Sequence, residues 1–121
     1  MTEQKIPVRA EVPEENTWRL EDIFATDEAW KAEYEALQKM PEQIAAYAGH
    51  LGESAETLLA YYRLSDELTV RLSKLMGYAS QKLDQDTANG FYLDTNPSMM
   101  LLLLRYTLYS SRTCSFSSYD T

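Results

Sequence analysis

The stretch that decides the fold is residues 54–86, SAETLLAYYRLSDELTVRLSKLMGYASQKLDQD. Its apolar residues recur at steps of three and four, which places them on one face of an α-helix. They are Leu58, Tyr61, Leu64, Leu68, Leu72, Leu75, Ala79 and Leu83. Ser54 is suited to cap the N-terminus of this helix, and the charged residues fall mostly off its apolar stripe. The sequence therefore predicts a helix from Ser54 through Leu83, roughly 45 Å long, whose stripe the rest of the chain covers only in part.

A second helix is predicted just upstream, where the Thr26 hydroxyl precedes two acids that suit a helix start. Its apolar stripe is interrupted by Pro41, which predicts a kink or a restart with the proline in the first turn. Gly49 is expected to end the helix, and residues 49–52 form a short connection. Because short connections join antiparallel neighbours, residues 27–48 are expected to fold back on residues 54–83 as a helical hairpin.

The flanks of this hairpin differ from it in composition. Residues 1–25 predict an extended arm, followed by an aromatic anchor that packs onto the helices through a single turn; the anchor residues are Trp18, Leu20, Ile23 and Phe24. Residues 26–92 form the hairpin. Residues 93–121 contain no Lys or Glu, and Met99–Leu104 has no polar face. We therefore expect an all-α fold with an irregular, divergent C-terminal tail, of the kind that a shifted reading frame near Tyr92 would produce.

Charge and composition exclude several classes of function. The formal net charge of −8 disfavours nucleic acid and anionic membranes, which both reward a basic surface. The apolar run at 99–104 is far shorter than the ~20 residues that cross a bilayer. The single cysteine, Cys114, excludes an intramolecular disulfide, and residues 1–7 lack the apolar core of a secretory signal. A cytoplasmic protein with no membrane or nucleic-acid partner is expected.

Residues 9–24, RAEVPEENTWRLEDIF, resemble the opening of oligoendopeptidase F, a zinc metallopeptidase of the thimet oligopeptidase group. The resemblance runs from residue 5 to about residue 92, and further matching segments lie at 27–30, 33–34, 49–52, 54–58, 78–79 and 84–87. It implies that this region is helical and forms part of one wall of a substrate channel. It also implies that the chemistry, hydrolysis of internal peptide bonds of oligopeptides, lies in a downstream His-Glu-x-x-His helix. There two imidazoles four residues apart bind zinc and the glutamate activates a water.

That zinc motif is absent from the sequence, whose only histidine is His50. No catalytic, cofactor-binding or metal-binding residue is therefore carried over. The expectation is a non-catalytic N-terminal fragment, inactive alone, with zinc only in the parent family. One alternative is a free-standing helical interaction module that docks a partner along its apolar stripe. Another is a fragment that complements a separately encoded catalytic half. Expected partners are the missing catalytic domain or a second copy.

Each candidate site residue also has a plainer structural role. His50 fits a surface loop, and Cys114 has no histidine after it to activate a thiolate. The paired carboxylates suit helix capping in exposed, polar settings better than acid–base work: Glu14-Glu15, Glu21-Asp22, Asp27-Glu28 and Asp84/Asp86. The aromatic residues are typical of helix packing, with channel lining left open for Tyr62 and Tyr78: Trp18, Trp30, Tyr34, Tyr47, Tyr61, Tyr62 and Tyr78.

Overall fold

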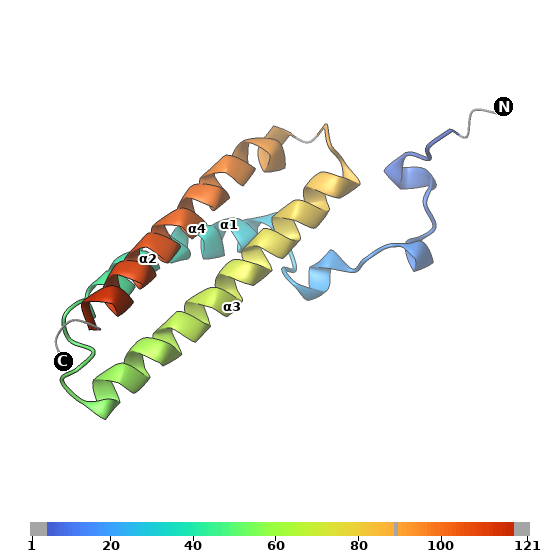
Figure 1. Cartoon of the computed structure of the whole chain (residues 1–121). Coiled ribbons are helices and arrows are strands. Elements are labelled where there is room, and N and C mark those ends of the chain that lie inside the picture. Colours follow the sequence, from blue (N-terminus) through green and yellow to red (C-terminus); the bar gives the residue numbers. More distant parts are fainter. Residues whose placement is uncertain (1–4, 89, 118–121) are drawn as a thin grey trace.

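The computed structural model describes residues 5–88 and 90–117, and within these ranges it contains helices, turns and loops but no strand. This confirms the all-α prediction. The α-helices are α1 (Asp27–Leu37), α2 (Met40–Ala45), α3 (Ala55–Gln85) and α4 (Gly90–Ser117). Three single 3-10 turns precede them: η1 (Arg9–Glu11), η2 (Glu14–Asn16) and η3 (Leu20–Asp22). Figure 1 shows α3 and α4 as two long helices side by side, with α1 and α2 packed beside them. The N-terminal arm, which includes η1 and η2, extends to one side of this bundle.

The long helix α3 forms as predicted, with 31 residues. The Ser54 hydroxyl caps it by accepting a hydrogen bond from the backbone N–H of Thr57 at 3.1 Å. Much of the apolar stripe is buried, through Tyr61, Leu68, Leu72, Leu75 and Ala79, and Tyr78 beside the stripe is buried as well. Leu58, at the first turn of the stripe, is 37% exposed and lies outside the core.

The other arm of the hairpin restarts at the proline. Thr26 caps α1 by accepting from the N–H of Ala29 at 3.1 Å, and α2 carries Pro41 in its first turn. A proline there removes only a donor that the first turn leaves unpaired anyway. Turns follow Ala45, so α2 ends earlier than predicted, and Gly49 adopts a positive φ of 80° within the connection. α1 and α2 then pack antiparallel against α3, which confirms the hairpin.

The prediction of an irregular tail is wrong. Residues Gly90–Ser117 form one helix of 28 residues that packs against both α2 and α3. It buries Tyr92, Met99, Leu102 and Thr113. A helix with apolar residues on all sides shows no amphipathic period, so the sequence pattern that identifies α3 is missing here. α4 also covers much of the α3 stripe, whereas Leu58 stays 37% exposed and Leu64 and Leu83 are only partly buried.

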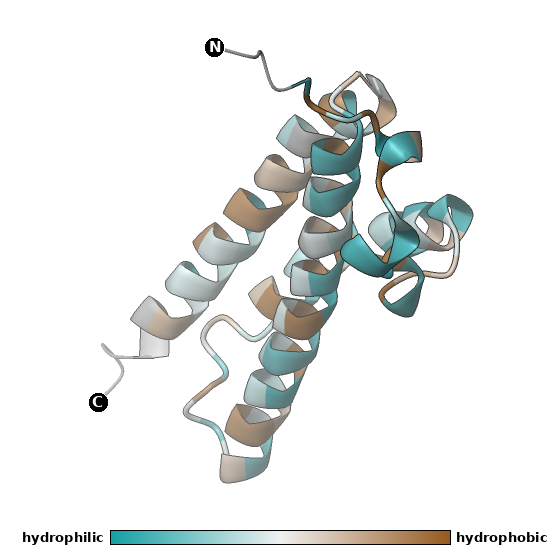
Figure 2. Cartoon of the chain, turned by 90° about the vertical axis from the view of Figure 1, so that its right-hand side faces the viewer, coloured by the Kyte–Doolittle hydropathy of each residue, from teal (hydrophilic) through white to brown (hydrophobic). Residues whose placement is uncertain are grey.

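Exposed apolar surface is present, as expected, but much of it lies on α4. Leu93, Met100, Leu101, Leu104 and Leu108 are each between 51% and 62% exposed. In Figure 2, α4 lacks the hydrophilic colouring that covers much of α3. Among the described residues, no helix is long and apolar enough to cross a membrane.

The predicted aromatic anchor packs without its tryptophan. Leu20 is 2% exposed, and Ile23 and Phe24 pack against the core, with the Phe24 ring edge-on to Tyr78 at 5.4 Å between centroids. η3 supplies the predicted single turn. Trp18 is 81% exposed, so its assignment to the anchor is wrong. Only Arg19 separates it from Leu20, but Leu20 begins the η3 turn that packs on the core and Trp18 precedes that turn.

Replacing Pro97 by alanine should stabilise the chain. Pro97 lies inside α4 and is exposed, so it removes one backbone hydrogen bond without contributing to the core. An interior proline costs about 3 kcal/mol, and the freer unfolded chain of the variant returns up to about 1 kcal/mol. We expect a net gain of about 2 kcal/mol in the free energy of unfolding, measured by urea denaturation. An unchanged or lower midpoint would mean that α4 does not continue through this residue.

Candidate functional site

The polar residues that lie between helices gather in separate junctions. The first is centred on Asp27, at the start of α1. Its Oδ1 accepts hydrogen bonds from the hydroxyls of Tyr78, at 2.7 Å, and Tyr92, at 2.5 Å. The ammonium of Lys82 lies 3.8 Å from the same oxygen. The carboxylate therefore ties the start of α1 to the end of α3 and the start of α4.

The electrostatics of this junction favour an ionised carboxylate. Burial alone raises the pKa of Asp27, but the hydrogen bonds from Tyr92 and Tyr78 and the charge of Lys82 outweigh it, so the pKa lies below its usual value. Burial and the bond to Asp27 raise the pKa of Tyr78 to about 12, and they raise that of Tyr92 further. Asp27 is thus a fixed acceptor and the tyrosines are fixed donors at neutral pH. General acid–base work needs a pKa near the working pH, which this junction does not provide.

The prediction that all the paired carboxylates are exposed is wrong for Asp27. Its neighbour Glu28 is exposed, as are the other members of those pairs, whereas Asp27 is half-buried. An acidic residue in the first turn of a helix is ordinarily explained by its interaction with the helix dipole. The two tyrosines that bind Asp27 come from 51 and 65 residues further along, which no local pattern reveals.

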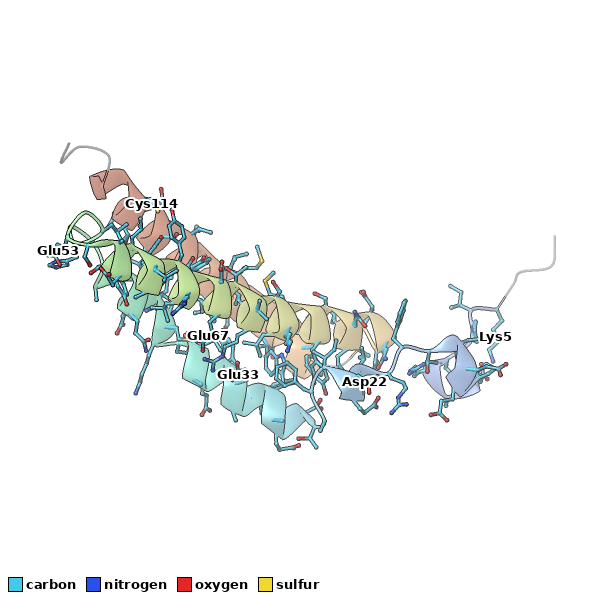
Figure 3. The ribbon with its side chains drawn as sticks, turned by 90° about the horizontal axis from the view of Figure 1, so that it is seen from below. Lys5, Asp22, Glu33, Glu53, Glu67 and Cys114 are labelled. Carbon is cyan, nitrogen blue, oxygen red and sulfur yellow. The ribbon has the colours of Figure 1, made fainter. Side chains whose placement is uncertain are left out.

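The second junction is centred on Arg71 of α3. Its Nε and Nη2 donate to the two carboxylate oxygens of Glu33 on α1, at 2.6 and 2.9 Å. Its Nη1 donates to Glu67 at 3.1 Å and also lies 3.2 Å from the sulfur of Met40. Figure 3 shows Glu33 and Glu67 on facing sides of the α1–α3 seam. A two-bond guanidinium–carboxylate pair fixes orientation as well as distance, so it sets how α1 lies on α3.

Glu33→Gln should lower stability at neutral pH and flatten its acid dependence. The Arg71 hydrogen bonds lower the pKa of Glu33 below its usual value of 4.5, against the effect of burial. The pair therefore stabilises the fold fully above pH 4.5 and loses that effect as the pH falls through the lower folded-state pKa. We expect a loss of about 1–3 kcal/mol at pH 7 and little at pH 2. Denaturant melts at several pH values measure this, with exposed Glu35→Gln as the control; equal losses for both variants would contradict it.

The two candidate single residues lie apart from these junctions. His50 lies in the exposed connection before α3, with Nδ1 2.6 Å from Oε1 of Glu53. The Cys114 thiol lies 3.2 Å from the hydroxyl of Tyr61. Burial, and then the bond to Cys114, raise the pKa of Tyr61 to about 12. Figure 3 places Cys114 and Glu53 at one end of the bundle and Lys5 and Asp22 toward the other. Asp22, a member of one of the paired carboxylates, therefore lies far along the bundle from His50 and Cys114.

The aromatic residues mainly pack the core, as predicted. Trp30, Tyr61 and Tyr78 are 2% exposed or less, and the Trp30 ring stacks on Tyr34 at 5.4 Å. Channel lining by Tyr78 is therefore wrong, because its ring is buried and its hydroxyl is bound to Asp27. Tyr62 is 54% exposed, so for it channel lining stays a prediction.

A hollow lies between the arm and the end of α3. It has a volume of about 630 Å³ and is lined by residues 6–10 of the arm together with residues 82 and 84–87. A smaller hollow of about 370 Å³ adjoins it beside Trp18. Both are open, and their charged residues are a mixture of lysine, arginine and aspartate with no histidine or cysteine. Neither has the donor set of a catalytic centre.

Comparison with known proteins supplies the relationship that the geometry leaves open. The chain is 42% identical over 100 residues to "Oligopeptidase PepF" of Bacillus subtilis, in a match that covers 79% of the chain. The chain is homologous to oligoendopeptidase F. It is also 37% identical over 99 residues to "Oligoendopeptidase F, chromosomal" of Lactococcus lactis, and 33% identical over 108 residues to "Group B oligopeptidase PepB" of Streptococcus agalactiae. These matches cover 81% and 89% of the chain.

The relationship to oligoendopeptidase F involves only a small part of the relatives. The matched region spans 15–17% of the length of each of these three proteins. No family model matches the chain, and no solved structure matches it.

The zinc that this family implies does not fit the residues described here. Among residues 5–88 and 90–117, no three His, Cys, Asp or Glu side chains are grouped closely enough to hold a metal ion. The sequence offers one imidazole, whereas a His-Glu-x-x-His site needs two on one helix face. The nearest partner of that imidazole is Glu53, in an exposed loop. No catalytic step through zinc is derived for this chain.

Proposed function

We propose that this chain is the non-catalytic N-terminal part of a cytoplasmic zinc oligoendopeptidase, and that it has no peptidase activity alone. One observation carries the proposal: the homology covers 79–89% of the chain but only 15–17% of each relative, and the chain has a single histidine. The homologous region thus contributes helices rather than metal ligands. In a complete parent, which would cut oligopeptides, these helices would form part of the wall around the substrate.

The packing supports a scaffolding role. The buried polar groups hold helices together: Asp27 joins three helix ends, and Arg71 joins α1 to α3. In the described residues, every fully buried side-chain nitrogen and oxygen has a hydrogen-bond partner. Active sites commonly keep polar groups poised for a ligand, and these junctions instead satisfy their groups internally.

A second candidate function is a free-standing helical interaction module, which the exposed apolar residues of α4 favour. Under this proposal the chain acts by binding another protein, and its function needs no catalytic part. A related possibility is complementation, in which the chain binds a separately encoded catalytic part. Neither proposal involves nucleic acid or a membrane.

The nucleotide sequence around and beyond the codon for Tyr92 separates these proposals. The peptidase proposal expects the family pattern to continue, in this frame or a shifted one, to a His-Glu-x-x-His codon series. A gene that stops without such a region, with no catalytic half encoded nearby, would contradict it and favour the interaction module. The boundary near residue 92 between hairpin and divergent tail is tested by the same reading.

A further inference from the structure

The outward face of α4 carries a continuous apolar stripe that nothing in the described structure covers. Leu93, Met100, Leu101, Leu104 and Leu108 are spaced by seven, one, three and four residues, which places them on one side of the helix. Each is between 51% and 62% exposed, while Tyr92, Met99 and Leu102 on the other side are buried. The stripe is roughly 22 Å long at about 1.5 Å per residue.

Charge distribution shows which partner suits this stripe. The chain carries −8, so two copies repel each other over most of their surfaces. The charge is unevenly distributed, since α3 carries as many acids as bases, and the charged residues of α4 are Asp94, Arg105 and Arg112. A second copy can therefore approach the α4 face without the repulsion that the acidic α1 imposes. A basic partner would instead be attracted to α1, which carries four acids and one base.

The three charges of α4 also favour one orientation of the second copy. They are separated by eleven and seven residues, which are close to whole numbers of turns, so they follow one flank of the stripe. Asp94 is exposed near one end, and the arginines lie toward the other. Consider two copies whose α4 stripes meet antiparallel along an apolar seam and are related by a two-fold axis. The charged flanks of the two α4 helices then lie on the same side of this seam and run in opposite directions. Asp94 of each copy then lies within about one turn of Arg105 of the other.

We propose that the chain forms an antiparallel homodimer through the α4 stripe, with the two-fold axis passing between Met100 and Leu101. Leu93 of one copy faces Leu108 of the other, and the two Asp94–Arg105 pairs flank the apolar seam. A parallel pair would place the charged flanks on opposite sides of the seam, where they cannot meet. The dimer is independent of whether a complete parent peptidase exists.

Sedimentation equilibrium of the full chain at neutral pH tests the dimer. We expect twice the 13.9 kDa mass of one chain at high concentration. Leu104→Asp should weaken association by at least about tenfold, because it places two charges in the seam. Val70→Asp, at a 55% exposed position on α3, is the matched control and should leave association unchanged. Circular dichroism checks that both variants keep their helices.

A charge exchange tests the orientation. Asp94→Arg and Arg105→Asp should each weaken the dimer, and the double variant should restore it to within about threefold, since both pairs are then remade with reversed sign. Arg105 also lies 3.5 Å from Glu42 in its own chain, a contact that the double variant does not restore. A chain that stays monomeric, a dimer that survives Leu104→Asp, equal loss with Val70→Asp, or no recovery in the double variant would overturn the proposal.

Discussion

Trp30→Ala is expected to destabilise the chain by about 3–5 kcal/mol, the usual cost of removing a large buried aromatic side chain. Trp30 is 1% exposed. Its indole N–H donates to the backbone oxygen of Leu75 at 2.9 Å, and its ring contacts Phe91 and Tyr92 edge-on. One side chain from α1 therefore contacts both long helices. Because small domains are stable by only about 5–15 kcal/mol, the variant should be close to unfolded at 37 °C.

The other tryptophan provides the control for this variant. Trp18 is 81% exposed, so Trp18→Ala should change the free energy of unfolding by no more than about 0.5 kcal/mol. Trp30→Phe keeps an aromatic ring and loses only the indole bond, so it should cost less than the alanine variant. Urea denaturation followed by circular dichroism measures all three. A loss for Trp18→Ala as large as that for Trp30→Ala would restore Trp18 to the anchor and contradict the structure.

At a concentration where the chain is monomeric, Leu102→Ala is expected to cost about 2–5 kcal/mol, whereas Leu101→Ala next to it should cost about 0.5 kcal/mol or less. Leu102 is 2% exposed and Leu101 is 62% exposed. The two residues are chemically identical and adjacent, and they differ only in the side of α4 on which they lie. The contrast therefore measures whether α4 packs as a helix with this rotation. Equal and small effects would mean that residues 99–104 are irregular, as the sequence suggests.

The hairpin was predictable because its signals are local and periodic. The eight apolar residues of the α3 stripe recur at helical spacing from Leu58 to Leu83. The Ser54 and Thr26 caps both form as predicted. An interruption at Pro41, as a kink or as a restart, was expected because proline breaks a helix interior, and the structure has the restart. These features need no knowledge of the rest of the chain.

The packing of α4, the polar junctions and the exposure of Trp18 depend on long-range contacts that no local sequence pattern predicts. α4 lacks an amphipathic period, and only the stripe of α3 that it covers gives its apolar residues a direction. Glu33 and Arg71 pair across 38 residues, and Asp27 meets Tyr92 across 65. Trp18 and Leu20 are both apolar and close together, and only the backbone between them decides which is buried. Absence of the zinc motif, by contrast, was readable directly from one histidine.

The central claim is that these helices are scaffold without chemistry, and a peptidase assay tests it most directly. The purified chain, supplied with zinc and internally quenched oligopeptides, should cleave no faster than buffer, because it offers one imidazole where the family's metal site needs two. A complete relative assayed in parallel shows that the substrates are adequate. Cleavage by the chain that a chelator abolishes and added zinc restores would contradict the account.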